Sequence, residues 1–149
     1  MRVIEYFASD CQEYWRSKIQ ESDWVAGKFL YNLLVSDGLS EYMDESARVL
    51  LLTEEDRLIS FCTLSAQDDI APTDLMPWIG FVYTFPQYRG NRYAGCLIDY
   101  ASELAKKEGF RKVYISTDQQ GIYEKYRFEY MGLMKDRRGG DSMVYFRHI

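Results

Sequence analysis

The sequence predicts an α/β fold, in which one mixed (α+β) sheet carries helices on both faces and residues 1–149 form a single domain. Two observations lead to this prediction. Stretches with strand-like apolar patterns alternate with stretches whose apolar residues recur every three or four positions. In addition, a strand, a helix and a strand follow one another within residues 78–117, which is the order of a βαβ unit with two parallel strands.

The N-terminal third of the chain predicts one strand and two helices. Residues 2–7 alternate well enough for a first strand. Residues 10–37 carry large apolar side chains at spacings closer to three and four than to two, as on one helix face. We expect two short helices here, broken near Gly27 and ended by Gly38, because glycine disfavours helix interiors and favours helix ends.

The next stretch predicts three strands. Residues 48–53 form an apolar stretch typical of a buried strand, and the polar cluster at 54–56 turns the chain into a second strand at 57–65. These two strands form an antiparallel hairpin. Residues 68–74 are a loop by composition, and a third strand follows at 78–85.

The strand at 78–85 begins the βαβ unit. Residues 86–91 form a loop, and residues 92–108 place their apolar side chains on one helix face, with Gly109 suited to end the helix. A strand at 112–117 completes the unit, parallel to the first.

The C-terminal stretch predicts a short helix near 121–126 and a β-hairpin. The strands of the hairpin are expected at 128–135 and 142–148, joined by a turn at 138–141. The predicted sheet is therefore antiparallel at its start and end and parallel only in the middle.

Composition excludes several classes of protein. The 18 Lys and Arg residues are outnumbered by 23 Asp and Glu, which gives a formal charge of -5. We expect no nucleic-acid partner, because that would require a clustered basic surface. No apolar stretch approaches the roughly 20 residues that span a bilayer, and the charged N-terminus does not resemble a signal peptide. We therefore expect a cytoplasmic protein with no membrane partner.

Cysteine and histidine restrict the chemistry further. Cys11, Cys62 and Cys96 stand at unrelated spacings, which indicates free thiols rather than a disulfide framework. The only histidine is His148, so a Ser-His-Asp triad or a multi-histidine metal site would depend on that one residue. We expect no metal.

The loop before the predicted long helix has the features of a phosphate-binding site. A helix N-terminus offers free backbone N–H groups and the positive end of the helix dipole. Gly90, Ala94 and Gly95 are small enough to let a pyrophosphate approach the backbone, and Arg89 and Arg92 add positive charge. Cations at a helix N-terminus cost roughly 0.3–1 kcal/mol each unless an anion lies there. The two arginines therefore predict an anion.

Two general phosphate motifs fit this loop poorly. Gly90 and Gly95 have the glycine spacing of a P-loop, but Cys96 and Leu97 stand where Lys and Ser or Thr are required. A dinucleotide fingerprint would need a glycine where Arg92 stands, and no acidic residue ends a strand about 20 positions later.

A third motif fits better. Pro-Gln-Tyr-Arg-Gly-Asn at 86–91, leading into Ala94-Gly95 and an apolar helix, closely resembles motif A of the GNAT superfamily of acyl-CoA N-acyltransferases. That motif is Arg or Gln, two residues, Gly, one residue, then Gly or Ala. Here Arg92 replaces the middle glycine. The resemblance implies that acetyl-CoA, the acyl-donor substrate, binds at Arg89, Gly90, Asn91, Arg92, Tyr93, Ala94 and Gly95.

A second segment agrees with the first. Residues 121–128, Gly-Ile-Tyr-Glu-Lys-Tyr-Arg-Phe, resemble the family's C-terminal motif, a Tyr-Glu-Lys helix that runs into Gly-Phe. Arg127 again replaces a glycine. The resemblance covers the order of elements across the whole chain, and its residue-level support is confined to about 78–132. It implies a GNAT-like fold in which the strand at 78–85 splays from the next strand and opens a cleft.

The resemblance also assigns roles to individual residues. Backbone groups of Val82, Tyr83 and Thr84 would pair with the pantetheine arm as an added strand would, and one N–H near Val82 would donate to the thioester oxygen. Tyr123 aligns with the family's general acid, which protonates the coenzyme A thiolate. A tyrosine, with a reference pKa near 10, is protonated at neutral pH. Tyr126 is the alternative acid, and the general base stays open.

The function implied is that of an acyl-CoA-dependent N-acetyltransferase that moves acetyl directly from acetyl-CoA to a primary amine. The acceptor is a small molecule or a protein amine, and a homodimer is compatible with this activity. The alternative is a catalytically silent acyl-CoA-binding or sensing module of the same fold, as the two missing glycines would allow.

The resemblance also implies that the acceptor lies among the N-terminal helices. Residues 1–46 hold nine acidic residues against four basic ones, interleaved with Tyr14, Trp15, Trp24, Tyr31 and Tyr42. An acidic, aromatic lining suits a cationic amine. The other interpretation is a solvated helix face over core aromatics.

Overall fold

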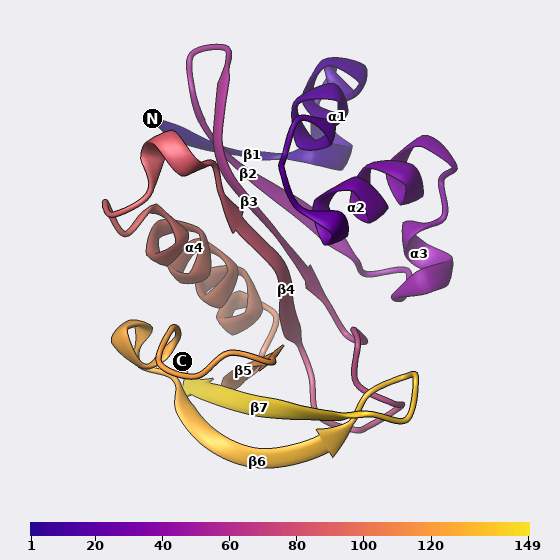
Figure 1. Ribbon diagram of the computed structural model, residues 1–149, viewed down its shortest axis with the longest axis vertical. Coiled ribbons are helices and arrows are strands. Elements are labelled where there is room, and N and C mark those ends of the chain that lie inside the picture. Colours follow the sequence, from indigo (N-terminus) through magenta and orange to yellow (C-terminus); the bar gives the residue numbers. More distant parts are fainter.

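The computed structural model describes residues 1–149 and contains one seven-stranded sheet with helices on both faces (Figure 1). Its strands are β1 (Arg2–Glu5), β2 (Arg48–Glu54), β3 (Arg57–Ser65), β4 (Trp78–Thr84), β5 (Lys112–Thr117), β6 (Glu129–Lys135) and β7 (Asp141–His148). Its helices are α1 (Gln12–Gln20), α2 (Val25–Val35), α3 (Leu39–Tyr42) and α4 (Tyr93–Lys107). Three 3-10 turns are η1 (Tyr6–Ala8), η2 (Pro86–Tyr88) and η3 (Glu124–Tyr126).

The order of strands across the sheet is β1-β2-β3-β4-β5-β7-β6. Only β4 and β5 are parallel, and every other neighbouring pair is antiparallel. The predicted fold class is therefore confirmed, including the central βαβ unit and the C-terminal hairpin. The last strand, β7, lies between β5 and β6 rather than at the edge of the sheet. None of the helices combines the length and hydropathy of a membrane span.

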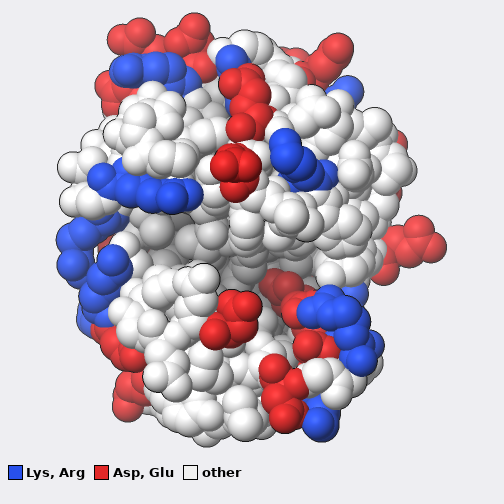
Figure 2. Space-filling model, viewed as in Figure 1, with Lys and Arg blue, Asp and Glu red and all other residues white.

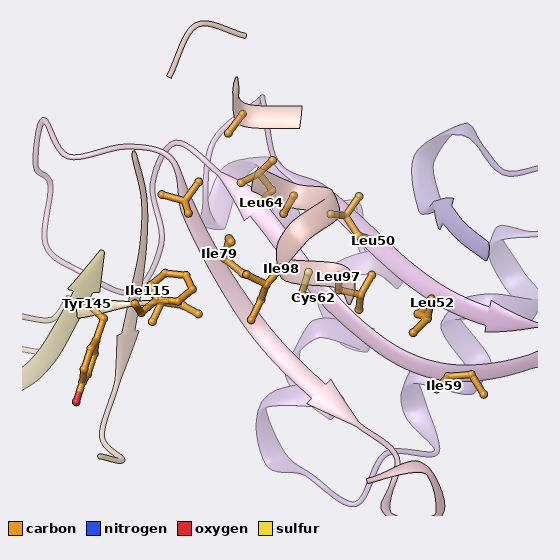
Figure 3. Close-up of a cluster of buried hydrophobic side chains, with 14 residues drawn as sticks. Leu50, Leu52, Ile59, Cys62, Leu64, Ile79, Leu97, Ile98, Ile115 and Tyr145 are labelled. Atoms are coloured by element: carbon orange, nitrogen blue, oxygen red, sulfur yellow. The ribbon is translucent and has the colours of Figure 1, made fainter. Parts of the chain in front are cut away.

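Two apolar clusters fasten the helices to opposite faces of the sheet. On one face, α4 buries Leu97 and Ile98 against strand residues that include Cys62 and Ile79 (Figure 3). On the other face, α1 and α2 contribute to a second buried cluster, whose helical members are Trp15, Ile19, Leu30 and Leu34. Because both faces of the central strands are covered, these strands are apolar on both sides, as the continuous stretch in β2 predicted.

Strands β4 and β5 separate soon after they meet. Their pairing consists of Trp78 opposite Tyr114, together with a bond of 3.0 Å from the Tyr114 backbone N–H to the Pro77 carbonyl. Beyond this point the two strands diverge, so the splayed arrangement that the family resemblance implied is present. Their carboxyl halves leave backbone groups along an open gap in the middle of the sheet.

A β-bulge on β4 adds to this opening. Gly80 pairs with Thr63 and Tyr83 pairs with Phe61, so two residues of β4 stand opposite the single residue Cys62. One of the two, Phe81, has a φ of 50°, which is uncommon for an aromatic residue. Backbone strain of this kind gathers at functional sites. It therefore marks the middle of β4 as a place to look for one.

The helix break near Gly27 was predicted wrongly. The chain leaves α1 after Gln20 and enters α2 at Trp24, an extended residue that caps the helix, so the break lies at residues 21–24. Gly27 is a buried residue inside α2. A Cβ at Gly27 would lie 2.1 Å from the Ser22 Oγ atom. Glycine is therefore needed there for the close approach of the linker, and not to end a helix.

Smaller differences concern three other elements. The first strand ends at Glu5 instead of residue 7, and η1 follows it. Helix α2 ends at Val35, and Gly38 precedes a third helix, α3, that the sequence did not predict. The short helix expected near 121–126 is the single 3-10 turn η3. All three elements are four residues or fewer, which is too short for a periodic apolar pattern to identify.

Gly27→Ala should destabilise the protein by roughly 1–3 kcal/mol, because the new methyl group meets the buried Ser22 Oγ. Urea unfolding followed by circular dichroism measures this change. In a Ser22→Ala background the Oγ atom is gone and the Cβ of residue 22 remains as a close contact at 3.2 Å. The same substitution should therefore cost much less there, and the better helix propensity of alanine, about 1 kcal/mol, offsets part of the remaining cost. A loss of stability that is equal in both backgrounds would contradict this account of Gly27.

Candidate active site

A cleft of about 890 Å³ opens where β4 and β5 separate. Its walls are the bulged half of β4, the end of β5, the loop before α4 and the segment that leads into η3. Figure 2 shows a hollow in the middle of this face, with Lys and Arg side chains along its left side. The cleft therefore joins the two motif segments, which are some 30 residues apart in the sequence.

Most of the residues predicted to form the site line this cleft. They are Val82, Tyr83, Thr84, Arg89, Gly90, Arg92, Tyr93, Ala94 and Tyr123. Asn91 and Gly95 lie outside the lining. The Asn91 side-chain amide donates to the Tyr88 carbonyl at 3.0 Å and so holds the loop in its turn. Gly95 permits a close contact, because a Cβ there would lie 2.8 Å from the Tyr126 ring.

The loop before α4 keeps a glycine-like backbone in spite of Arg92. Gly90 has a φ of 86°, and Arg92, the residue that caps α4, has a φ of 58° and a ψ of 30°. This left-handed conformation is the one that a glycine would adopt easily. The arginine therefore adopts a backbone conformation that is open to glycine, and the amides of the first turn of α4 are directed out of the helix end.

The two arginines of the loop are held in different ways. Arg89 donates from Nε to the Thr84 carbonyl at 2.9 Å, and its guanidinium lies 5.3 Å from the centre of the Tyr83 ring. Arg92 donates from Nη2 to the Lys125 carbonyl at 2.9 Å and lies 5.3 Å from the centre of the Tyr126 ring. Both side chains are thus fixed beside the helix N-terminus, with further N–H groups free for an anion.

Tyr123 reaches the cleft from the base of η3. Its ring packs edge-on against Phe128 at a centroid distance of 6.0 Å. Burial, with smaller effects of Cys62 and Tyr126, raises the pKa of Tyr123 to about 12. The hydroxyl therefore carries its proton throughout the neutral range, which is the state that a proton donor needs.

Tyr126 lines the same cleft but is held as part of the wall. Its ring packs on Gly95, and Arg92 and Lys125 lie 5.3 and 5.2 Å from its centre. Contacts of this kind between cations and an aromatic face stabilise the position of the ring, which indicates a structural role for Tyr126.

Acidic and aromatic residues also reach the cleft, although fewer than the composition of residues 1–46 indicated. From that stretch only Asp23 and Trp24 line it, and Asp118 after β5 adds a second carboxyl group. Trp24 stacks on Tyr83 with a centroid distance of 5.4 Å and an interplanar angle of 10°. The other aromatics face elsewhere, and Trp15 belongs to the core.

Asp68 is a buried carboxyl group that adjoins the cleft at Gly80. From the sequence we expected this residue only as part of a loop. Its Oδ1 accepts the Asp69 backbone N–H at 2.8 Å, while Oδ2 has no partner. Oδ2 lies 2.1 Å from the position that a Cβ of residue 80 would have. The carboxyl group therefore fills the space that a side chain at residue 80 would need. The signal in the sequence was Gly80, because a glycine inside a strand marks a close approach.

Burial raises the pKa of Asp68 to about 7. The Asp69 backbone N–H and the charge of Arg137 lower it, and the charge of Asp69 raises it, but these effects are smaller than that of burial. Asp68 can therefore gain or lose a proton near neutral pH. The structure contains no group of three or more His, Cys, Asp or Glu side chains arranged to hold a metal ion.

Comparisons with known proteins are consistent with this geometry. The family model described as the acetyltransferase (GNAT) family matches residues 5–128. No curated protein matches the chain. Among solved structures, an aminoglycoside 6′-N-acetyltransferase complexed with coenzyme A has a TM-score of 0.72 at 13% identity, with 99% of this chain and 97% of that chain covered.

Two further solved structures are similar over the same share of each chain, 99% of this one and 97% of theirs. The aminoglycoside 6′-N-acetyltransferase of Enterococcus faecium has a TM-score of 0.70 at 13% identity. A GNAT family acetyltransferase of Elizabethkingia anophelis with acetyl-CoA bound has a TM-score of 0.66 at 14% identity. At these identities the likeness establishes the fold.

Asp68→Asn should stabilise the protein at pH 8 and remove part of its pH dependence. Native Asp68 keeps its proton up to about pH 7, whereas unfolded Asp68 loses it near 3.8. The native state therefore binds the extra proton between these values, and the wild-type free energy of unfolding should fall as pH rises from about 4 to 7. The advantage of the variant should grow over that window to a few kcal/mol, because a tenfold difference in proton affinity corresponds to about 1.4 kcal/mol.

Chemical denaturation at pH 4, 6 and 8 measures this advantage. Asp118→Asn, which removes an exposed carboxyl group, is the control and should not stabilise the protein by a few kcal/mol. An Asp68→Asn advantage that does not change with pH would show that the native carboxyl group titrates normally.

Proposed function

This chain belongs to the GNAT acetyltransferase family, and we propose on that basis that it transfers an acetyl group from acetyl-CoA to a primary amine. The observation that carries the proposal is the cleft itself. It combines the open strand edges of β4 and β5, the N-terminus of α4 and the hydroxyl of Tyr123 in one cavity. The solved structures with coenzyme A or acetyl-CoA bound share this fold and support the same donor for this chain.

Each part of acetyl-CoA has a matching part of the cleft. The free backbone groups along β4 suit the amides of the pantetheine arm, as an added strand would. The first-turn amides of α4, with Arg89 and Arg92 beside them, suit the pyrophosphate. In this pose the bulge at Phe81 and Val82 directs a backbone N–H toward the thioester oxygen, where it would stabilise the developing negative charge.

The reaction requires three proton movements. The acceptor ammonium first loses a proton, and its nitrogen then attacks the thioester carbonyl carbon to form a C–N bond. The C–S bond breaks, and the coenzyme A thiolate takes the proton of the Tyr123 hydroxyl. Tyr123 regains a proton from the nitrogen of the new amide, and the first proton is taken by a general base, which later releases it to solvent. The products are the acetylated amine and coenzyme A.

Asp68 is our proposal for the group that accepts the first proton. An alkylammonium has a pKa near 10.4 and is charged at neutral pH. A base with a pKa near 7 is matched to this task, and the pKa of Asp68 is about 7. The basis is its carboxyl group beside Gly80, one residue from the bulge. If Asp68 is the base, kcat/KM of the wild type should fall toward acidic pH, and this fall should be absent from Asp68→Asn.

The lining of the cleft favours a cationic acceptor. Asp23 and Asp118 are its acidic residues, and Trp24 presents an aromatic surface beside Asp23. A protonated amine is attracted by both kinds of group. The basic residues of the lining, Arg89, Arg92 and Lys125, suit the phosphates of the donor. Because several similar structures are aminoglycoside acetyltransferases, aminoglycosides belong in a screen of acceptors beside polyamines and lysine peptides.

A silent acyl-CoA sensor remains the second candidate. The observation behind it was the loss of two motif glycines, but Arg92 and Arg127 keep the left-handed backbone that those glycines would have. This backbone conformation supports the enzyme rather than the sensor. Binding of acetyl-CoA without thiol release from any amine in the screen would favour the sensor.

Coenzyme A and acetyl-CoA should raise the melting temperature of the protein, because a ligand that binds only the native state stabilises it by mass action. At a ligand concentration of about 100 Kd the gain is roughly 2.7 kcal/mol. Differential scanning fluorimetry measures the shift. NADH and ATP are the controls and should act much more weakly. Equal shifts with all four ligands would mean that the cleft recognises phosphate alone.

Tyr123→Phe should lower kcat by roughly 100-fold or more while leaving the affinity for acetyl-CoA nearly unchanged, because the variant loses only the proton donor. Thiol release with an active amine gives kcat, and calorimetry gives the affinity. Tyr126→Phe is the matched control from the same cleft wall and should keep most of the activity. If Tyr126→Phe were the inactive variant, the acid would have been assigned to the wrong tyrosine.

A further inference from the structure

A second, smaller cavity lies beside the cleft, between the first turn of α4, the end of η3 and β7. Its volume is about 280 Å³. We call it the arginine pocket after the side chains that line it, principally Arg92, Asp99, Lys125, Tyr126, Arg127 and Arg147. Four cations and one carboxylate thus surround a small space in a chain whose net charge is -5.

Two of these arginines occupy backbone positions that disfavour them. Arg92 has a φ of 58° and Arg127 a φ of 70°, both left-handed. A non-glycine residue in this conformation costs roughly 1–2 kcal/mol. Both also stand where the resembling motifs have glycine. The two departures from the motifs, far apart in the sequence, therefore bring two guanidinium groups to the same cavity.

The third arginine is buried. Arg147 on β7 is 6% exposed and donates from Nη2 to the Asp99 carboxylate at 2.7 Å. Its Nη1 lies 3.5 Å from the Tyr126 carbonyl, and its Nε has no partner. Asp99 is also 3.8 Å from Arg127. One carboxylate thus serves two arginines, and the positive charge of the pocket exceeds what its own acid can neutralise.

The pocket and the cleft share a wall. Arg92, Lys125 and Tyr126 line both cavities. Arg92 bonds to the Lys125 carbonyl at 2.9 Å and lies over the Tyr126 ring, so the three residues of this wall contact one another. A ligand in the cleft can therefore place a charged group against the arginines without leaving the protein surface. Guanidinium groups bind phosphate oxygens in a forked geometry.

We propose that the arginine pocket binds a phosphate monoester, namely the ribose 3′-phosphate of coenzyme A whose pyrophosphate lies at the N-terminus of α4. The proposal rests on the proposed function in so far as coenzyme A is the source of that phosphate. The same pocket chemistry would also take the phosphate of a separate molecule. Arg127 can be used to distinguish this site from the cleft, because it is an exposed arginine that lines only the pocket.

The test compares coenzyme A with dephospho-coenzyme A, which lacks only the 3′-phosphate. Calorimetry at fixed ionic strength should show that wild type binds coenzyme A about tenfold more tightly, equivalent to about 1.4 kcal/mol. Arg127→Gly should bring the two affinities together by weakening coenzyme A alone. Glycine accepts the left-handed backbone at this position, so folding is preserved. Arg111→Ala removes an exposed arginine elsewhere and should change neither affinity.

The outcomes separate the two proposals. The proposal for the pocket would be overturned by three results together. Wild type would bind the two cofactors with equal affinity, Arg127→Gly would change neither affinity, and inorganic phosphate would not raise the melting temperature. These results would leave the proposal for the cleft intact. If neither cofactor binds, the proposed function fails. The melting-temperature measurement with inorganic phosphate then still decides whether the arginine pocket binds phosphate. A phosphate-dependent rise in wild type that Arg127→Gly abolishes, with equal cofactor affinities, would assign the site to a separate phosphate ester.

Discussion

The separation of β4 from β5 is the constraint on which the rest of the structure depends. One paired position, Trp78 with Tyr114, joins the two halves of the sheet. Each of these two strands is therefore held mainly by its antiparallel neighbour: β4 pairs with β3, and β5 pairs with β7. Helix α4 packs on strands of both halves and bridges the gap. Backbone N–H and C=O groups that are left unpaired in the interior of a sheet destabilise the fold unless water or a ligand bonds to them. The separation of the two strands therefore exposes the same backbone groups that an extended ligand can bind.

Aromatic packing compensates for the irregular backbone at the opening. The strained Phe81 has Trp24 and Phe29 at centroid distances of 6.4 Å, and Tyr83 beyond the bulge is stacked on Trp24 and in contact with Phe61. The Tyr83 hydroxyl also accepts the Asp23 backbone N–H at 3.3 Å. The linker between α1 and α2 is thereby attached to the bulge. The high aromatic content of the chain thus has a local use, which is to hold β4 in a shape that the strand alone would avoid.

The sequence predicted the larger elements well because these carry long periodic patterns. The apolar face of α4 and the continuous apolar stretch of β2 each had one interpretation, and the parallel pairing of β4 with β5 followed from the βαβ unit. The break near Gly27 was misplaced because glycine has two uses, ending a helix and permitting a close contact, and only the position of Ser22 distinguishes them. Asp68 was missed for a similar reason. Its burial depends on Gly80, which is distant in the sequence, and no local pattern shows that the two meet. The left-handed backbone of Arg92 and Arg127 was equally hidden, since the residue type argues against it.

The position of β7 has a consequence for how the molecule assembles. Strand β5 forms one wall of the cleft, yet on its β4 side it has a single paired position, and its full partner is β7. During synthesis β5 therefore emerges without the strand that will hold it, while β1 to β4 and their helices can already pack. The half of the sheet that closes the cleft is thus expected to order last, and the chain acquires its ligand-binding capacity only in the final step of folding.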